Sequence, residues 1–245
     1  MTRSTLPSFL TLAALAAATC ALGAEPGAAG RGRQALLGKA YNPATMSLAA
    51  YDNVWKQWGL DEKPKDFPQQ LRQRYGLHEA PYDNDGYPMG VRLAERPLNL
   101  GKGLAVTCLV CHGGSIAGKS YVGLGNASLD YQAFYEDMAE ADGSRRKTPF
   151  QFCNVRGTNE AGGMAVFLLG YRDPDLKLRV TRLDLDLHDD LCEDVPAWWL
   201  LKKKQTMYYT GGGNARSVRS LMQFMLTPLN PRSAFEREED RKSVV

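Results

Sequence analysis

Cys108-Leu109-Val110-Cys111-His112 is the stretch on which the interpretation of this 245-residue chain depends. Cysteines three positions apart can share one helical turn, and the C-x-x-C-H pattern is the attachment signature of c-type haem. Each thiol adds to one vinyl group of the porphyrin, and the adjacent imidazole binds the iron as an axial ligand. The sequence therefore predicts one covalent haem c, attached through Cys108 and Cys111 and ligated by His112.

Two other chemistries use paired cysteines. A structural zinc site needs two further ligands, normally a second closely spaced pair. The remaining candidates are scattered singly along the chain: Cys153, Cys192, His78 and His188. A thioredoxin-like redox pair would follow a strand in a βαβ unit. A histidine directly after the second cysteine suits haem better, so zinc and redox chemistry are the alternatives.

Residues 1–24 have the pattern of a secretory signal peptide. Arg3 is their only charge, an apolar stretch follows it, and the small residues Gly23 and Ala24 precede a plausible cleavage point. No later stretch reaches the roughly 18 apolar residues of a membrane span. Covalent haem attachment in bacteria takes place outside the cytoplasmic membrane. We therefore expect a periplasmic or secreted bacterial protein with no membrane span in its mature chain.

Charge and the remaining cysteines give weaker indications. The formal net charge is +3, and basic and acidic residues alternate along the chain. Nucleic acid is therefore not an implied partner. Cys153 and Cys192 could form a disulfide in an oxidising compartment or remain two buried thiols, and the sequence leaves both possibilities open.

Apolar periodicity predicts a mainly α domain over residues 41–235, with long irregular loops and little strand, and the haem motif within it makes the expected domain cytochrome c-like. A flexible leader is expected over 25–40 and a tail over 236–245. The expected helices are one opened by Asn42-Pro43 with an apolar face reaching Trp58, then Gln69–Tyr75, Leu129–Ala141, Ala165–Tyr171 and Ala215–Leu226. A hairpin-like segment is expected over 115–125, and a turn, rather than a calcium loop, over 83–86 because the distant glutamate is missing.

The sixth iron ligand separates electron transfer from chemistry on oxygen or peroxide. A closed six-coordinate iron shuttles electrons, whereas an open position can bind a substrate. Met164 is a candidate because paired glycines before it would let the backbone approach a haem edge. His188 and His78 are alternatives, as is an open site. A methionine beside an apolar helix is also a common core residue.

Other residues are candidates for lining the haem. Arg156, Arg216 and Arg219 could pair with propionates, because guanidinium binds carboxylate in a bidentate manner. Trp198 and Trp199 could stack near the porphyrin or simply pack in the core.

Several strings resemble the N-terminal haem domain of dihaem c-type cytochromes, which group with bacterial dihaem peroxidases and rubber-cleaving oxygenases. The strings are Asp85-Gly-Tyr-Pro-Met-Gly90, Thr107-Cys-Leu-Val-Cys-His-Gly-Gly114, Gly123-Leu-Gly-Asn126 with Leu129-Asp130, Arg156-Gly-Thr-Asn159 and Asp194-Val-Pro-Ala-Trp-Trp199. The likeness covers roughly residues 40 to 230. It implies a redox partner protein or a downstream haem domain as partner. The family has a second C-x-x-C-H, which this chain lacks, so electron passage between two haems is not expected within it.

The favoured function is electron transfer by an exported protein with one haem c. The alternative is a haem-dependent oxygenase or peroxidase module with an open distal site, and a third possibility is the non-catalytic half of such an enzyme. Residues Asp240 to Val245 match the translation of a common sequencing adapter. We therefore expect the natural protein to continue past about residue 235, with a second haem motif there.

Overall fold

More residues lie in helices than in strands in the part of the chain that the structure describes. The computed structural model describes residues 27–144, 147–148, 150–151, 153, 155–185, 187, 192–208 and 211–241, apart from the side chains of 218, 219 and 239–241. The α-helices are α2 (Ala28–Gly38), α3 (Leu48–Asn53), α4 (Phe67–Tyr75), α5 (Tyr131–Ala141), α6 (Ala161–Leu169), α7 (Val218–Leu221) and α8 (Arg232–Arg241). The 3-10 helices are η2 (Val54–Trp58), η3 (Pro97–Asn99), η4 (Cys108–Val110), η5 (Trp198–Lys203) and η6 (Gln223–Met225).

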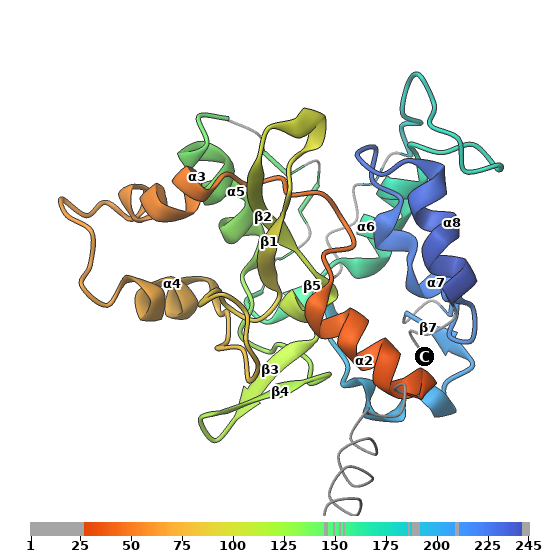
Figure 1. Cartoon of the computed structure of the whole chain (residues 1–245), viewed down its shortest axis with the longest axis horizontal. Coiled ribbons are helices and arrows are strands. Elements are labelled where there is room, and N and C mark those ends of the chain that lie inside the picture. Colours follow the sequence, from red (N-terminus) through yellow and green to blue (C-terminus); the bar gives the residue numbers. More distant parts are fainter. Residues whose placement is uncertain are drawn as a thin grey trace, which may run out of the picture.

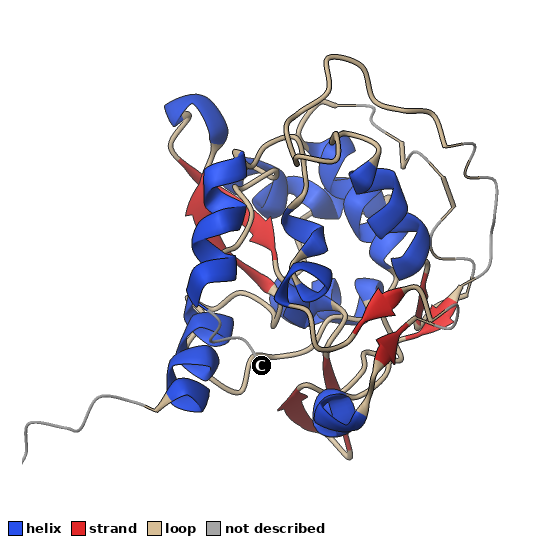
Figure 2. Ribbon diagram, turned by 90° about the vertical axis from the view of Figure 1, so that its right-hand side faces the viewer, coloured by secondary structure: helices blue, strands red, loops and turns tan. Residues whose placement is uncertain are grey.

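The strands form small antiparallel pairs. They are β1 (Val91–Glu95) with β2 (Lys102–Val106), β3 (Gly113–Ile116) with β4 (Lys119–Val122), β5 (Thr158–Asn159) with β6 (Glu193–Asp194), and β7 (Thr206–Met207) with β8 (Gly213–Asn214). Figure 2 shows these pairs scattered among the helices and loops. The register of β1 on β2 places Val91 opposite Val106 and Leu93 opposite Leu104, so apolar side chains pair on the face toward the core.

The expectation of a mainly α, cytochrome c-like domain with little strand is wrong. The structure has 38% helix and 15% strand, the latter in small antiparallel sheets. Strands of two to five residues are too short to give a periodic pattern, and their pairing depends on partners elsewhere in the chain. The sequence could therefore not reveal most of them.

Two apolar clusters form the core of the described part of the chain. We call the first the motif cluster because Val110 belongs to it and Cys111 packs against it. Its buried members are Met46, Ala50, Tyr51, Val54, Phe67, Leu71, Tyr75, Leu77, Val91, Leu104, Val110, Leu129, Phe134 and Met138. The second, which we call the C-terminal cluster, consists of Tyr41, Leu168, Met222, Met225, Leu226 and Phe235. In Figure 1, α3, α4, α5 and the β1–β2 hairpin lie on one side, and α6, α7 and α8 lie on the other.

Local signals explain the helices of the motif cluster. Helix α4 has a proline in its first turn and ends at Gly76, whose φ of 65° is left-handed. Helix α5 is capped by Asp130, whose carboxylate accepts a hydrogen bond from the Ala133 amide at 3.1 Å. The helices expected near these positions are confirmed.

Most other expected elements are also present. The hairpin after the motif is confirmed as β3–β4, and the first expected helix appears as α3 followed by η2. Residues 83–86 form the expected turn, in which Tyr87 N–H donates to Asn84 O at 2.9 Å. The expected helix over 215–226 is broken into α7 and η6.

The two ends of the described chain differ from the expectation. Residues 25–40 were expected as a flexible leader, yet α2 occupies most of them. Helix α8 runs from Arg232 to Arg241 into the expected tail, and its Phe235 is buried. Lys39, just after α2, forms an ion pair with Glu238 of α8. The Leu37 carbonyl of α2 accepts a hydrogen bond from the Arg92 guanidinium, and Phe235 of α8 belongs to the C-terminal cluster. Each helix therefore has tertiary contacts that its local sequence does not show.

The expected signal peptide, residues 1–24, lies outside the described residues. None of the described helices is both long and apolar enough to cross a membrane.

Candidate haem-attachment site

The C-x-x-C-H segment forms a single tight turn. Val110 N–H donates to Thr107 O at 3.0 Å, and His112 N–H donates to Cys108 O at 3.0 Å. Leu109 and Val110 are buried, whereas Cys108 is exposed and Cys111 is half-buried. The two apolar residues therefore anchor the turn in the core, and both cysteines belong to the same turn.

Neighbouring segments bind the backbone of this turn from both sides. Gly123 N–H donates to His112 O at 2.8 Å, and Thr107 N–H donates to Gly90 O at 2.8 Å. Gly90 has a φ of 88°, and a Cβ there would lie 2.1 Å from Val110 N. Only glycine permits this approach, which explains why the Asp85–Gly90 string ends in glycine.

His112 is held by the segment that leads into η5. Its Nδ1 lies 3.3 Å from Pro196 O, and its ring stacks on Trp198 with a centroid distance of 4.4 Å and an interplanar angle of 26°. Burial lowers the pKa of His112 to about 4, against the opposing effect of the Pro196 carbonyl and with a smaller contribution from Lys204. The imidazole is therefore neutral at pH 7.

This arrangement determines the tautomer of His112. A carbonyl oxygen only accepts hydrogen bonds, so Nδ1 must carry the proton. The lone pair of the neutral ring then lies on Nε2, in the plane of the imidazole. Trp198 covers a face of the ring and leaves that in-plane direction unaffected. A second nitrogen bonded to a backbone carbonyl is the usual arrangement of metal-binding histidines.

The Cys111 thiol has a partner from a distant strand. Asn159 of β5 donates from Nδ2 to Cys111 Sγ at 3.1 Å. Burial raises the pKa of Cys111 to about 12, although the hydrogen bond from Asn159 lowers it, and the side chain stays partly exposed. The sulfur is therefore a protonated thiol at neutral pH in this environment.

The candidate distal ligands lie in other surroundings. Met164 is in α6 and packs against the C-terminal cluster, whereas Cys111 packs against the motif cluster. His78 directs Nε2 to Asn126 Oδ1 and to Ser128 Oγ, each at 3.0 Å. His188 lies outside the described residues. Met164 is thus a packing residue of the C-terminal cluster, and the Nε2 of His78 is already bonded to Asn126 and Ser128.

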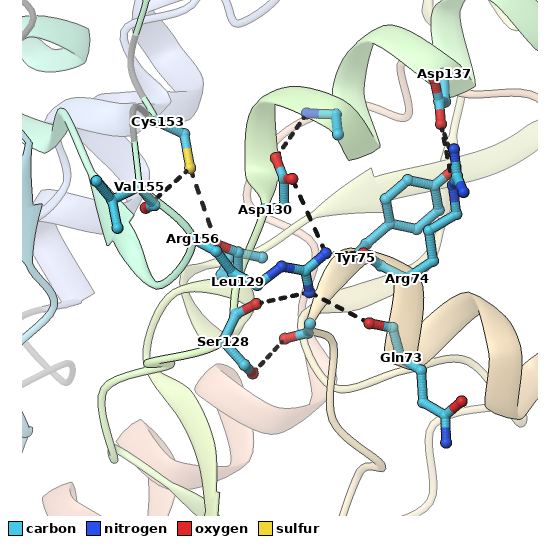
Figure 3. Close-up of polar contacts among 12 residues, drawn as sticks. Gln73, Arg74, Tyr75, Ser128, Leu129, Asp130, Asp137, Cys153, Val155 and Arg156 are labelled. Carbon is cyan, nitrogen blue, oxygen red and sulfur yellow. Dashed lines mark hydrogen bonds and ion pairs between the residues drawn. The ribbon is translucent and has the colours of Figure 1, made fainter. Parts of the chain in front are cut away.

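Arg156 binds backbone carbonyls at the end of α4. Its guanidinium donates to Gln73 O and Ser128 O, both at 3.2 Å, and to Arg74 O, as Figure 3 shows. Asp130 faces the same group at 4.0 Å. The Arg156 guanidinium thus satisfies the Gln73 and Arg74 carbonyls at the C-terminal end of α4. The structure therefore gives Arg156 a structural role, where a propionate contact was expected.

Arg216 is better placed for an anionic group. It lines an open hollow of about 380 Å³ together with Gln205, Thr206, Asn214 and the glycines 211–213. Its Nε donates to Lys204 O at 3.3 Å, and Lys204 follows directly after η5, which begins at Trp198. Arg216 is thus connected through η5 to the partner of His112. The side chain of Arg219 lies outside the described part.

Neither Cys153 nor Cys192 forms a disulfide in the structure. Cys153 points toward Val155 O at 3.6 Å and Leu129 O at 3.9 Å (Figure 3). Burial raises the pKa of Cys153, and Cys192 contributes to the shift, so the two sulfurs are within electrostatic reach. No group of three His, Cys, Asp or Glu side chains suited to a metal ion occurs among the described residues. The described residues therefore give no support to the zinc alternative.

Most of the residues that hold the site carry no recognisable signal in the sequence. Asn126, Asn159 and Pro196 all lie in strings that carry the resemblance to dihaem cytochromes, but nothing local in those strings reveals their contacts with the motif. Trp198 was a candidate only in general terms. The structure brings all four to the C-x-x-C-H turn or its neighbours.

Comparison with models of known protein families gives no match, and comparison with curated proteins gives none either.

Proposed function

We propose that this chain carries one haem c, attached through Cys108 and Cys111 with His112 as axial iron ligand, and that it transfers electrons. The observation that supports this most directly is the Nδ1 contact of His112 with Pro196 O, because it leaves the Nε2 lone pair available. The backbone bonds that close the turn keep both cysteines in it, and two cysteines three positions apart are the arrangement of the haem c attachment motif.

The roles of the chain's own residues follow from their positions. Cys108 and Cys111 tether the group, and His112 binds iron through Nε2. Arg216 offers a positive charge beside a hollow where a propionate would be stabilised. When bound, haem supplies a one-electron couple whose potential depends on axial ligation and burial. Trp198, stacked on His112, covers one face of the imidazole and would help to fix its orientation toward the iron.

The signal-like N-terminus supports a place outside the cytoplasmic membrane, where the thiols would meet the attachment machinery. A redox partner protein or a further haem domain would exchange electrons with the site. The likeness to dihaem cytochromes supports the same proposal, although no family model matches the chain.

Chemistry on oxygen or peroxide is a second candidate function. Met164 packs in the C-terminal cluster, and His78 directs Nε2 to Asn126 and Ser128. Since both of these described candidates are engaged, an open distal position is the arrangement that this second function would use, and such a position would bind small ligands. Rapid binding of carbon monoxide to the reduced protein would support this candidate, whereas a closed, unreactive iron would support electron transfer alone.

The test of haem attachment is coexpression with a cytochrome c maturation system. We expect the protein to gain the mass of one haem that survives denaturation. The double variant Cys108→Ala, Cys111→Ala should lose it completely, and His112→Ala should leave little stable holoprotein. As a matched control, Cys153→Ala removes a thiol outside the motif and should keep the haem.

Stoichiometric zinc with no covalent haem in the wild type would contradict the proposal. Retention of covalent haem by the double variant would contradict the assignment of the attachment residues.

A further inference from the structure

Asn126 is a buried polar residue that joins three segments of the chain. Its side chain is 1% exposed. The Nδ2 group donates to Gly76 O at 2.8 Å and to Val110 O at 3.1 Å. The Oδ1 atom lies 3.0 Å from the amide of Ser128 and 3.0 Å from His78 Nε2. Because carbonyls surround one end and donors the other, the orientation of this carboxamide is determined by its partners.

The same residue also binds the motif through its backbone. Asn126 N–H donates to Cys111 O at 2.8 Å. Val110 O and Cys111 O are carbonyls at the end of a one-turn helix, which has no following turn to satisfy them. Asn126 supplies donors to both, one from its side chain and one from its main chain. The next carbonyl, His112 O, is bound by Gly123 of the same string.

We infer that Asn126 is the positioning residue of the attachment turn. It holds Cys108, Cys111 and His112 in one turn before haem is attached, so that both thiols and the imidazole are presented together. This inference rests on the proposed function. His78 acts through Asn126, because its Nε2–H donates to Oδ1 and keeps the amide group turned toward Val110.

The chemistry explains why asparagine is required at this position. Aspartate has the same shape but no N–H, and it would place a carboxylate against two carbonyl oxygens. Alanine would leave Val110 O and Gly76 O without their buried donor. Both changes remove the donors while leaving the cysteines and His112 intact.

A matched control exists in the same half of the molecule. Asn84 is buried, and its Nδ2 donates to Tyr87 O, Pro88 O and Val91 O at 2.9 to 3.0 Å. Its side chain thus binds three backbone carbonyls, against two for the side chain of Asn126, and none of the three belongs to the C-x-x-C-H turn. Asn84→Ala therefore measures the cost of losing a buried asparagine as such.

The first experiment uses the full chain without haem and needs no attachment. Amide hydrogen exchange is measured at His112, whose N–H bonds to Cys108 O, and at Phe134, whose N–H bonds to Asp130 O in α5. Asn126→Ala should lower protection at His112 at least tenfold relative to Phe134. Asn84→Ala should lower protection at both amides by the same factor. An unchanged ratio in Asn126→Ala would overturn the inference.

The second experiment measures covalent haem per folded molecule after maturation. Asn126→Ala and Asn126→Asp should reduce it severalfold, while Asn84→Ala should stay at the wild-type ratio. Equal losses in Asn126→Ala and Asn84→Ala would assign a general structural role to Asn126. If the wild type takes up no haem, the proposed function fails, and the exchange ratio alone still decides whether Asn126 holds the turn.

His78→Gln covers the case in which variants of Asn126 do not fold. This change leaves Asn126 in place but alters the donor to Oδ1, and it should shift the exchange ratio in the same direction, by a few-fold. No shift in a folded His78→Gln protein would overturn the part of the inference that concerns His78. If the Asn126 variants do not fold although Asn84→Ala does, Ser128→Ala takes their place, because it removes the Ser128 hydroxyl that donates to Asn126 Oδ1. Ser128→Ala should then shift the exchange ratio by a few-fold. No shift in that variant would overturn the whole inference.

Discussion

The motif cluster and the C-terminal cluster differ in how completely they exclude water. In the motif cluster, Leu129 and Phe134 are 0% exposed, whereas Leu168 and Phe235 of the C-terminal cluster retain 7% and 3%. The C-x-x-C-H turn is built on the better-packed cluster, because Val110 belongs to it and Cys111 packs against it. A site that must present three groups in one geometry thus rests on the part of the molecule with the least freedom to relax.

Beside each cluster lies a buried polar side chain that binds several backbone carbonyls, one of them from a member of the cluster. Beside the first it is the neutral Asn126. Beside the second it is Arg172, which donates to Leu176 O, Leu226 O, Thr227 O and Asn230 O at 2.6 to 3.2 Å. Burial lowers the pKa of Arg172. Buried carbonyls in irregular segments need hydrogen-bond donors. A neutral carboxamide supplies them beside the motif cluster, and a guanidinium supplies them beside the C-terminal cluster.

The largest expected effect is the loss of a core aromatic from the motif cluster. Phe134 is completely buried, and its ring lies 5.3 Å from that of Tyr75. Phe134→Ala should lower the free energy of unfolding by about 3–5 kcal/mol, because it opens a cavity that tight packing cannot close. Phe235→Ala should cost about 2–3 kcal/mol, since the C-terminal cluster can relax more.

Denaturant unfolding followed by tryptophan fluorescence measures both losses. Equal losses would show that the two clusters are equally rigid and would remove the contrast between them.

The next effect concerns alkaline pH. Burial raises the pKa of Tyr51, Tyr75 and Tyr131 above their usual value. In the unfolded chain these phenols ionise near pH 10, while in the folded protein they stay protonated. Their contribution to stability is therefore complete below about pH 10 and falls above it, by about 1.4 kcal/mol per pH unit for each tyrosine.

Between pH 10 and 11, the free energy of unfolding of Tyr75→Phe should fall less steeply with pH than that of the wild type, by the contribution of one tyrosine. The substitution should also cost about 1–2 kcal/mol at pH 7, because Tyr75 OH joins Trp58 and Asp137. Burial raises the pKa of Tyr208, beside the C-terminal cluster, to about 12. If Tyr208→Phe reduces the slope equally, the two regions unfold together; an unchanged slope would mean that they unfold separately.

The smallest expected effect is at Met164. As a partly buried residue of the C-terminal cluster, it should tolerate Met164→Leu with a change of less than about 1.5 kcal/mol. Met164→Ala should cost about 1–2 kcal/mol, less than a fully buried methionine. The visible spectrum of the haem-loaded protein should be the same in both variants. Loss of a sulfur-to-iron charge-transfer band in either one would place Met164 on the iron and contradict its assignment to the cluster.

Local patterns accounted for a definite part of the fold. The helices near 69–75 and 129–141 and the hairpin after the motif were predictable, because their caps, turns and apolar spacing act over a few residues. The leader and the tail were not, because α2 and α8 depend on contacts such as the Lys39–Glu238 pair. The short strands β5 and β6 exist only because residues 158–159 meet residues 193–194.

By itself, the sequence determined the chemistry that is available: two thiols and an imidazole at one spacing, which is a local property of five consecutive residues. Only the tertiary structure decided how those groups are held. Pro196 sets the tautomer of His112 from 84 residues away, Asn159 reaches Cys111 across 48, and Asn126 binds Val110 across 16. It also placed Met164 in the other cluster and Arg156 at the end of α4. Spacing along a chain carries no information about such distances, because they are created when burial of apolar side chains brings remote segments together.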